Sequence, residues 1–263
     1  MKAFLLRFAV LVALLPSAAL ASNSVVNLSH YDLMRVDFGA MREEGIVGVI
    51  HEATYPRNVR DAYYASRQAQ ATRAGLLWGA YHFANASDPV AQADFFLRTV
   101  SNAWYAAPAA SRPAHVLLVL DFEKNGHYPG GTMRLEQAIA FAERIRQRTG
   151  VYPGFYSNEH RISSVVNSSR LTAEQRRVLQ GCWLWVANYH YRPRQIAPWS
   201  RFTMWQYTGD GVCDLPRSSF PIGVANIRKA ERNIFNGDPS DARRFWQANG
   251  WTPGSARVPT ASE

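Results

Sequence analysis

His115-Val-Leu-Leu-Val-Leu-Asp121-Phe-Glu123 is an apolar run that closes on two acidic residues. The run predicts a β-strand, and residues two apart on a strand point to the same side, so Asp121 and Glu123 can face one cavity. Two nearby carboxylates repel when both are ionised, which raises one pKa. A carboxyl group with a raised pKa can protonate a glycosidic oxygen while its neighbour stabilises positive charge. The pattern also fits a strand end that meets solvent, or a pair of metal ligands.

Around this strand, short apolar or β-branched runs alternate with longer helical patterns. The predicted strands are Val25–Ser29, Val47–Ala53, Leu76–Phe83, Val116–Phe122, Tyr152–Tyr156, Cys182–Ala187, Phe202–Tyr207 and Ile227–Phe235. The predicted helices are Leu33–Glu44, Asp61–Ala74, Pro89–Asn102, Met133–Thr149 and Thr172–Leu179. This alternation predicts the α/β class, and eight strands predict a single-domain (β/α) barrel of TIM type. The barrel should be irregular, because no helix is predicted between the last three strands.

In such a barrel the reacting side chains lie at the C-terminal ends of the strands. The aromatic residues predicted at these ends can offer flat faces to sugar rings, although aromatic side chains also pack in cores. For substrate binding we favour Tyr81, Tyr156, Trp185 and Tyr189. Gln206 could hydrogen-bond a sugar substituent, while Trp205 is as easily a core residue.

The two ends of the chain differ in composition from the barrel. Lys2 and Arg7 precede an apolar run that ends at Pro16, and small residues follow, so residues 1–21 are predicted to be a signal peptide. An uncleaved anchor is the alternative, but the run is shorter than the roughly 20 residues that span a bilayer. No later segment could cross a membrane. We expect a barrel domain over residues 22–250, a disordered tail over 251–263, and a secreted or periplasmic location.

The formal net charge of +9 falls to +7 when Lys2 and Arg7 are removed. A basic exported protein is attracted to polyanions, among them acidic wall polymers. The same positive net charge would also be found if the proteins of the source were generally basic. No basic run with interleaved aromatic residues indicates nucleic-acid binding. We expect a monomer.

Two cysteines, Cys182 and Cys213, form an even pair that predicts a disulfide in an oxidising compartment. The loop between them would hold about 30 residues and contribute on the order of 3 kcal/mol in the chain-entropy model. Two cysteines without histidines at ligand spacing make a poor zinc site.

Several segments, in order, resemble the family-25 glycoside hydrolases, the muramidase (lysozyme) family. The segments are Asn27-Leu-Ser-His-Tyr31, Gly48-Val-Ile-His-Glu-Ala-Thr54, Ala74-Gly-Leu-Leu-Trp-Gly-Ala-Tyr-His-Phe83, Leu120-Asp-Phe-Glu123, Trp185-Val-Ala-Asn-Tyr189, Trp205-Gln-Tyr207 and Glu231-Arg-Asn233. The resemblance covers roughly residues 25–237. The order and spacing of these segments together, rather than any one motif, make the resemblance specific.

The resemblance implies cleavage of the β-1,4 bond between N-acetylmuramic acid and N-acetylglucosamine in peptidoglycan. It implies Glu123 as the general acid and base, with Asp121 orienting the substrate's 2-acetamido group or stabilising positive charge, and it implies no metal and no cofactor. The family usually has Asp where this chain has Asn27 and Glu231. These departures leave a second hypothesis open, a peptidoglycan-binding protein that has lost turnover.

Overall fold

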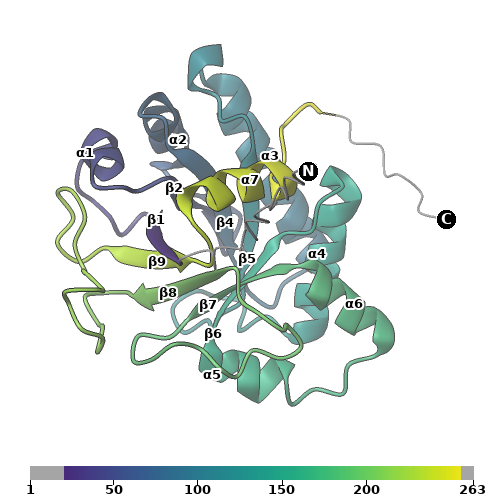
Figure 1. The fold of residues 1–263 in the computed structure, drawn as a ribbon. Helices are drawn as coiled ribbons and strands as arrows, with labels where there is room; N and C mark the ends of the chain where they lie inside the picture. Colours follow the sequence, from purple (N-terminus) through teal and green to yellow (C-terminus); the bar gives the residue numbers. More distant parts are fainter. Residues whose placement is uncertain (1–20, 256–263) are drawn as a thin grey trace, which may run out of the picture.

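The computed structural model describes residues 21–255, and its centre is a closed eight-stranded barrel (Figure 1). The strands are β1 Ser22–Leu28, β2 Gly48–Tyr55, β4 Leu77–Phe83, β5 Val116–Asp121, β6 Gly154–Asn158, β7 Trp183–Ala187, β8 Met204–Thr208 and β9 Glu231–Phe235. The sheet order is β1-β9-β8-β7-β6-β5-β4-β2-β3, and a parallel β1–β2 pairing closes it. The short β3 Val59–Arg60 pairs antiparallel with β2. The predicted α/β barrel is therefore confirmed.

The barrel is irregular as expected. No α-helix joins β7 to β8 or β8 to β9, and β9 runs antiparallel to both of its neighbours. The helices are α1 Phe38–Glu43, α2 Tyr64–Arg73, α3 Pro89–Ala106, α4 Leu135–Thr149, α5 Glu159–Arg161, α6 Ala173–Gly181 and α7 Pro239–Asn249. Two short non-α turns, η1 Ala109–Ser111 and η2 Ile162–Val166, complete the elements.

Two apolar clusters hold this arrangement. One packs the outer faces of the strands against the surrounding helices, and it includes Phe96, Leu118 and Phe141. The other fills the barrel interior, as in other barrels of this type, and includes Leu117 and Val119 on β5. Successive residues of β5 thus alternate between the two clusters, because side chains on a strand point to opposite faces in turn.

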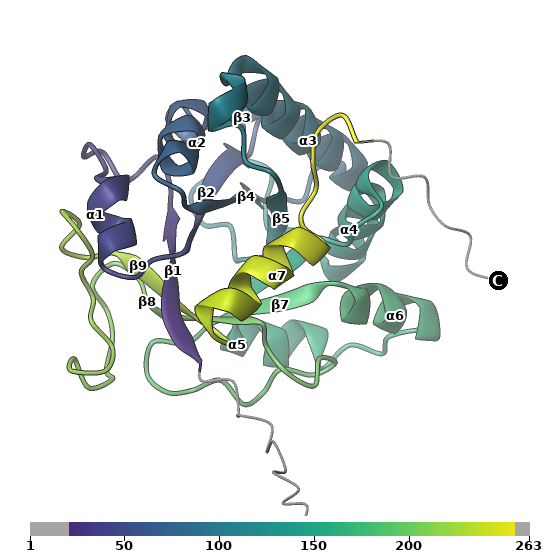
Figure 2. The same cartoon turned by 45° about the horizontal axis from the view of Figure 1, so that its top comes forward.

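Helix α7, which was not predicted from the sequence, covers the N-terminal end of the barrel (Figure 2). Asp238 caps it and Pro239 occupies its first turn, both common signals for a helix start. Trp246 of α7 belongs to the interior cluster, and its indole Nε1 donates to the Trp78 carbonyl at 2.9 Å. A bulky side chain therefore closes the end of the barrel where the strands begin.

Two predicted boundaries differ from the structure. Helix α1 begins at Phe38 instead of Leu33, because the Asp37 carboxylate accepts from the Ala40 N–H and caps the helix there. The tail does not begin at residue 251, since Trp251 pairs with Val116 at the start of β5. The described chain thus belongs to the barrel as far as Ser255. The predicted signal peptide, apart from Ala21, and residues 256–263 lie outside the described residues.

The predicted disulfide is also wrong, since Cys182 and Cys213 are both free and buried. Cys182 directly precedes β7, and Cys213 follows β8, which runs parallel to β7. The two thiols therefore lie near opposite ends of the barrel. A strand of this length spans roughly 17 Å, whereas a disulfide needs Cα atoms within about 7 Å. Among residues 21–255, no helix combines the length and apolar character needed to cross a membrane.

Candidate active site

The C-terminal ends of the strands open into a cavity of about 590 Å³. Seven of the nine predicted catalytic and binding residues line it: Asn27, Tyr81, Asp121, Glu123, Tyr156, Trp185 and Glu231. They come from β1, β4, β5, β6, β7 and β9 and the residues next to these strands. The parallel register brings them together, because Asp121 is aligned with Tyr156, and Tyr156 with Trp185, across three neighbouring strands.

Asp121 is the last residue of β5 and is buried. Burial raises the pKa of its carboxyl group well above the ordinary range, and the charges of Glu123, Glu52 and Glu231 raise it further. Its Oδ1 atom has no hydrogen-bond partner within residues 21–255. Buried polar atoms in native proteins are usually paired, so this oxygen is available to a group that enters the cavity.

Glu123 is half-buried and lies where the first cavity meets a second one of about 460 Å³. Burial raises the pKa of Glu123, while a hydrogen bond from Asn158 (Nδ2 to Oε1, 3.4 Å) and the charge of Arg161 lower it. The Arg161 guanidinium lies over the Phe122 ring at 4.1 Å, which fixes it close to the carboxyl group. Glu123 is thus an accessible carboxyl group that keeps its proton to a higher pH than a solvated one.

Asn27 and Glu231, the two departures from the family pattern, contact each other directly. The Asn27 Nδ2 group donates to the Glu231 carboxylate, and the Asn27 Oδ1 atom accepts from Asn233 at 2.9 Å. Asn233 in turn accepts from the Trp185 indole at 2.7 Å. Burial and neighbouring acids raise the pKa of Glu231 to about 8, although the bond from Asn27 lowers it. Both residues therefore face the cavity and belong to one network.

The two remaining predicted residues lie elsewhere. Tyr189 lines the second cavity, on the other side of Glu123. Gln206 is 1% exposed and lines neither cavity; its Oε1 atom accepts a hydrogen bond from the Tyr156 hydroxyl. Gln206 therefore positions Tyr156, and the predicted direct contact of Gln206 with substrate is not supported. Trp205 is buried, packs against Phe220, and is a core residue.

The site contains further acids that were not predicted from the sequence. Asp32, Glu52 and Asp210 also line the first cavity, so six carboxyl groups surround it, with Lys229 at its wall. Glu52 lies near the C-terminal end of a strand, where functional residues of such barrels are expected. Asp32 and Asp210 lie in loops, and no local sequence pattern indicates that they belong to the site. Asn158, which follows Tyr156 on β6 and contacts Glu123, could have been found from its place at a strand end.

Residues 26–214 match the family model described as "Glycosyl hydrolases family 25". The chain is 27% identical to "Lysozyme M1" of Streptomyces globisporus over 85% of this chain and 70% of that protein. A shorter segment is 38% identical to the "Autolytic lysozyme" of Clostridium acetobutylicum; it covers 25% of this chain and only 20% of that relative.

Solved structures show the same fold. The bacterial lysozyme from Streptomyces coelicolor superposes with a TM-score of 0.65 at 24% identity, over 87% of this chain and 99% of that one. A family GH25 lysozyme from Aspergillus fumigatus gives a TM-score of 0.60 at 22% identity, over 84% and 97% of the two chains.

Proposed function

This chain belongs to glycosyl hydrolase family 25, and from this premise we propose that it cleaves the β-1,4 bond between N-acetylmuramic acid and N-acetylglucosamine. Glu123 is the proposed general acid and base, and Asp121 assists it. The single observation that carries this proposal is the position of Glu123. It is a protonatable carboxyl group at the junction of two cavities, where a polymer on either side would place one of its bonds.

In the proposed reaction the Glu123 carboxyl group donates its proton to the glycosidic oxygen as the bond to the anomeric carbon breaks. Positive charge develops on the sugar in the first cavity. The Asp121 carboxyl group stabilises that charge, or holds the 2-acetamido group that does so. Glu123, now ionised, accepts a proton from the water that completes hydrolysis. Because the donor must be protonated, we expect the rate to fall as the pH rises through the pKa of Glu123.

The proposed substrate is peptidoglycan. Tyr81, Tyr156 and Trp185 line the first cavity and Tyr189 the second, so aromatic faces for sugar rings are present on both sides of Glu123. The names of the relatives, lysozyme and muramidase, agree with this substrate. The basic net charge favours approach to an acidic wall. We propose that the protein acts outside the cytoplasm, secreted or periplasmic, as a monomer and without a metal in the reaction.

The decisive test replaces the donor. Glu123→Gln keeps the shape of the side chain but cannot transfer a proton, and general acids contribute roughly 100-fold or more to rate. We expect wild-type protein to release reducing ends from peptidoglycan and Glu123→Gln to lose at least that factor. Glu143→Gln, an exposed change on α4, is the matched control and should keep full activity. Equal activity of Glu123→Gln and wild type would refute the assignment.

The second hypothesis, a peptidoglycan-binding protein without turnover, rests on the amide at Asn27. It predicts retention on insoluble wall with no reducing ends from wild-type protein. The variant Asn27→Asp then distinguishes two causes of inactivity, the amide at position 27 and a defect elsewhere in the site. Activity that appears in this variant would show that the amide had silenced the site, whereas continued inactivity would locate the defect elsewhere.

A further inference from the structure

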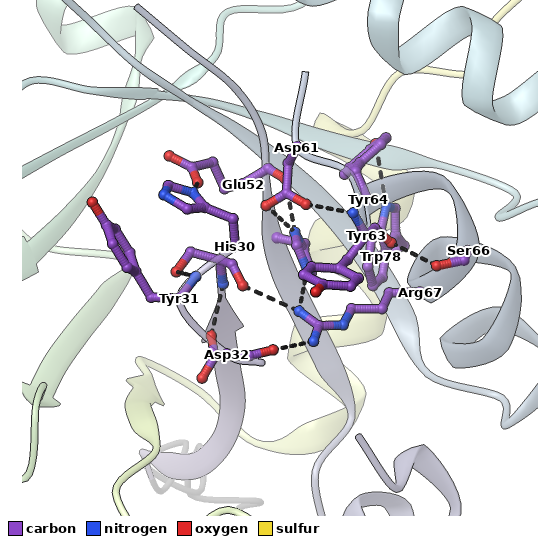
Figure 3. Close-up of polar contacts among 12 residues, drawn as sticks. His30, Tyr31, Asp32, Glu52, Asp61, Tyr63, Tyr64, Ser66, Arg67 and Trp78 are labelled. Atoms are coloured by element: carbon purple, nitrogen blue, oxygen red, sulfur yellow. Dashed lines mark hydrogen bonds and ion pairs between the residues drawn. The ribbon is translucent and has the colours of Figure 1, made fainter. Parts of the chain in front are cut away.

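A cluster of His30, Glu52 and Asp61 lies beside the first cavity and takes no part in the proposed reaction (Figure 3). His30 follows β1, Glu52 belongs to β2, and Asp61 follows β3. One side-chain nitrogen or oxygen atom from each residue lies within 4.8 Å of the other two. Glu52 and Asp61 are buried, with 3% and 5% of their surface exposed. Two carboxyl groups and one imidazole thus meet in a site that is largely closed to solvent.

One oxygen of Asp61 lacks a partner. Its Oδ1 atom accepts from the Tyr63 N–H at 2.7 Å, but its Oδ2 atom is buried without a hydrogen bond to any described residue. The nearest imidazole nitrogen, His51 Nδ1, is 3.8 Å away and donates instead to the Glu52 carbonyl at 2.7 Å.

Arg67, the nearby guanidinium, does not form an ion pair with Asp61 either. It donates to the carbonyl oxygens of Ser29, Asp32 and Met34 and to the Nε2 atom of His51. Figure 3 shows the contact with Asp32. These bonds hold the loop after β1 in place. The Asp61 carboxylate therefore faces Glu52 and His30 without a direct counter-charge, an arrangement that costs free energy unless something neutralises it.

His30 is oriented as a metal-binding histidine is. Its Nδ1 atom faces the Glu52 carboxylate, its Nε2 atom lies 3.3 Å from the Tyr128 hydroxyl, and its ring stacks on Tyr55 with centroids 4.6 Å apart. The Tyr128 hydroxyl is 3.1 Å from the Tyr31 hydroxyl, which extends the network. Ligating histidines commonly engage their second nitrogen in such a bond, which fixes the tautomer and the ring plane.

We propose that His30, Glu52 and Asp61 bind one divalent transition-metal ion, with Zn²⁺ preferred. One imidazole nitrogen and two carboxylate oxygens form a ligand set that suits Zn²⁺. The ion would balance the two buried carboxylates and give the free Asp61 oxygen a partner. Glu52 also lines the cavity, which provides a route of entry for the ion. The site lies beside the Glu123 donor rather than at it, so the proposal stands apart from the reaction mechanism.

The test uses metal binding without substrate. Wild-type protein is stripped with a chelator, loaded with Zn²⁺, passed through gel filtration and assayed for metal, and its unfolding is followed with and without Zn²⁺. We expect one Zn²⁺ per chain and a midpoint raised by roughly 5 °C. His30→Gln and Asp61→Asn should each weaken binding roughly 100-fold and lose this shift. Because the His30 side chain is 22% exposed, we expect His30→Gln to fold and to serve as the test if Asp61→Asn does not fold.

His190→Gln is the matched control, because His190 and Asp214 form a close histidine–carboxylate pair in which both side chains are exposed. This variant should bind Zn²⁺ as wild type does. The proposal is overturned if stripped wild-type protein retains no Zn²⁺, which would leave His30 and Glu52 as a simple ion pair. It is equally overturned if His30→Gln binds unchanged. Neither readout depends on turnover, so both remain informative if the proposed hydrolase activity is absent.

Discussion

The protonation of Glu123 is governed by its burial and by two neighbouring residues. Burial raises its pKa, whereas Asn158 stabilises the ionised form through a hydrogen bond and Arg161 through its charge. Burial and the two polar neighbours thus shift the pKa of Glu123 in opposite directions. The Glu123 carboxyl group can therefore both hold a proton for donation and release it. The amide of Asn27 has a similar influence on Glu231, since its hydrogen bond opposes the effect of burial.

Replacement of Arg161 should move the pH profile of the enzyme. The positive charge of Arg161 favours ionised Glu123, so Arg161→Gln should raise the pKa of Glu123 further. Activity needs the protonated acid, and its loss on the alkaline side should therefore occur at higher pH. The measurement is kcat/KM for peptidoglycan fragments against pH. Arg161→Lys keeps the charge and should stay near the wild-type profile.

This expectation fails if the alkaline limb of Arg161→Gln coincides with that of wild type, or moves to lower pH. Arg161 also donates to the Met133 carbonyl at 2.9 Å and covers Phe122, so Arg161→Gln also removes local packing. A loss of packing would lower activity at every pH without moving the alkaline limb of the pH profile. It can therefore be distinguished from a change in the pKa of Glu123.

At the scale of elements, α7 closes the barrel end opposite the candidate active site. Trp246 of α7 is 1% exposed, and its ring lies against Gly48 at the start of β2. A Cβ atom at Gly48 would sit 3.1 Å from that ring, so the glycine permits this close approach. The helix therefore packs closely against the start of β2 at this point.

Trp246→Ala should destabilise the protein without changing its chemistry. Truncation of a buried tryptophan costs about 3–5 kcal/mol, which corresponds to a fall of roughly 10 °C in Tm for a chain of this size. Because Trp246 lies at the far end of the barrel, kcat of the folded fraction should be unchanged. Thermal unfolding and activity below the transition measure the two effects. Arg243→Ala, an exposed change on α7, should alter neither.

At the scale of the whole molecule, the stability of the barrel does not depend on a covalent link. Cys182 and Cys213 are separated by the length of parallel strands, and both lie in apolar surroundings. Burial raises the pKa of the Cys182 thiol, which keeps it unreactive. Packing of the two apolar clusters on either side of the sheet supplies the stability.

Reducing agents should therefore leave the protein unchanged. We expect the same unfolding midpoint with and without a thiol reductant, and two titratable thiols per chain after denaturation. A reductant-dependent fall in the midpoint would mean that the cysteines pair after all, and that the strand ends lie closer than the structure places them.

The sequence alone determined the alternation of strands and helices, the barrel, and the acids at the end of β5. These features follow from local periodicity and from residues two apart on one strand, which need no knowledge of distant segments. It failed at α1 and α7, where capping residues rather than apolar spacing set the helix ends.

Only the tertiary structure decided which distant residues meet. Barrel closure brings Asn27 against Glu231 across 204 positions and His30 against Glu52 and Asp61, and it places Gln206 beneath Tyr156 instead of in the cavity. The same closure keeps the two cysteines apart. Such contacts depend on strand register and on the paths of loops, and the free energy that selects them comes from the packing of the whole molecule rather than from any local pattern.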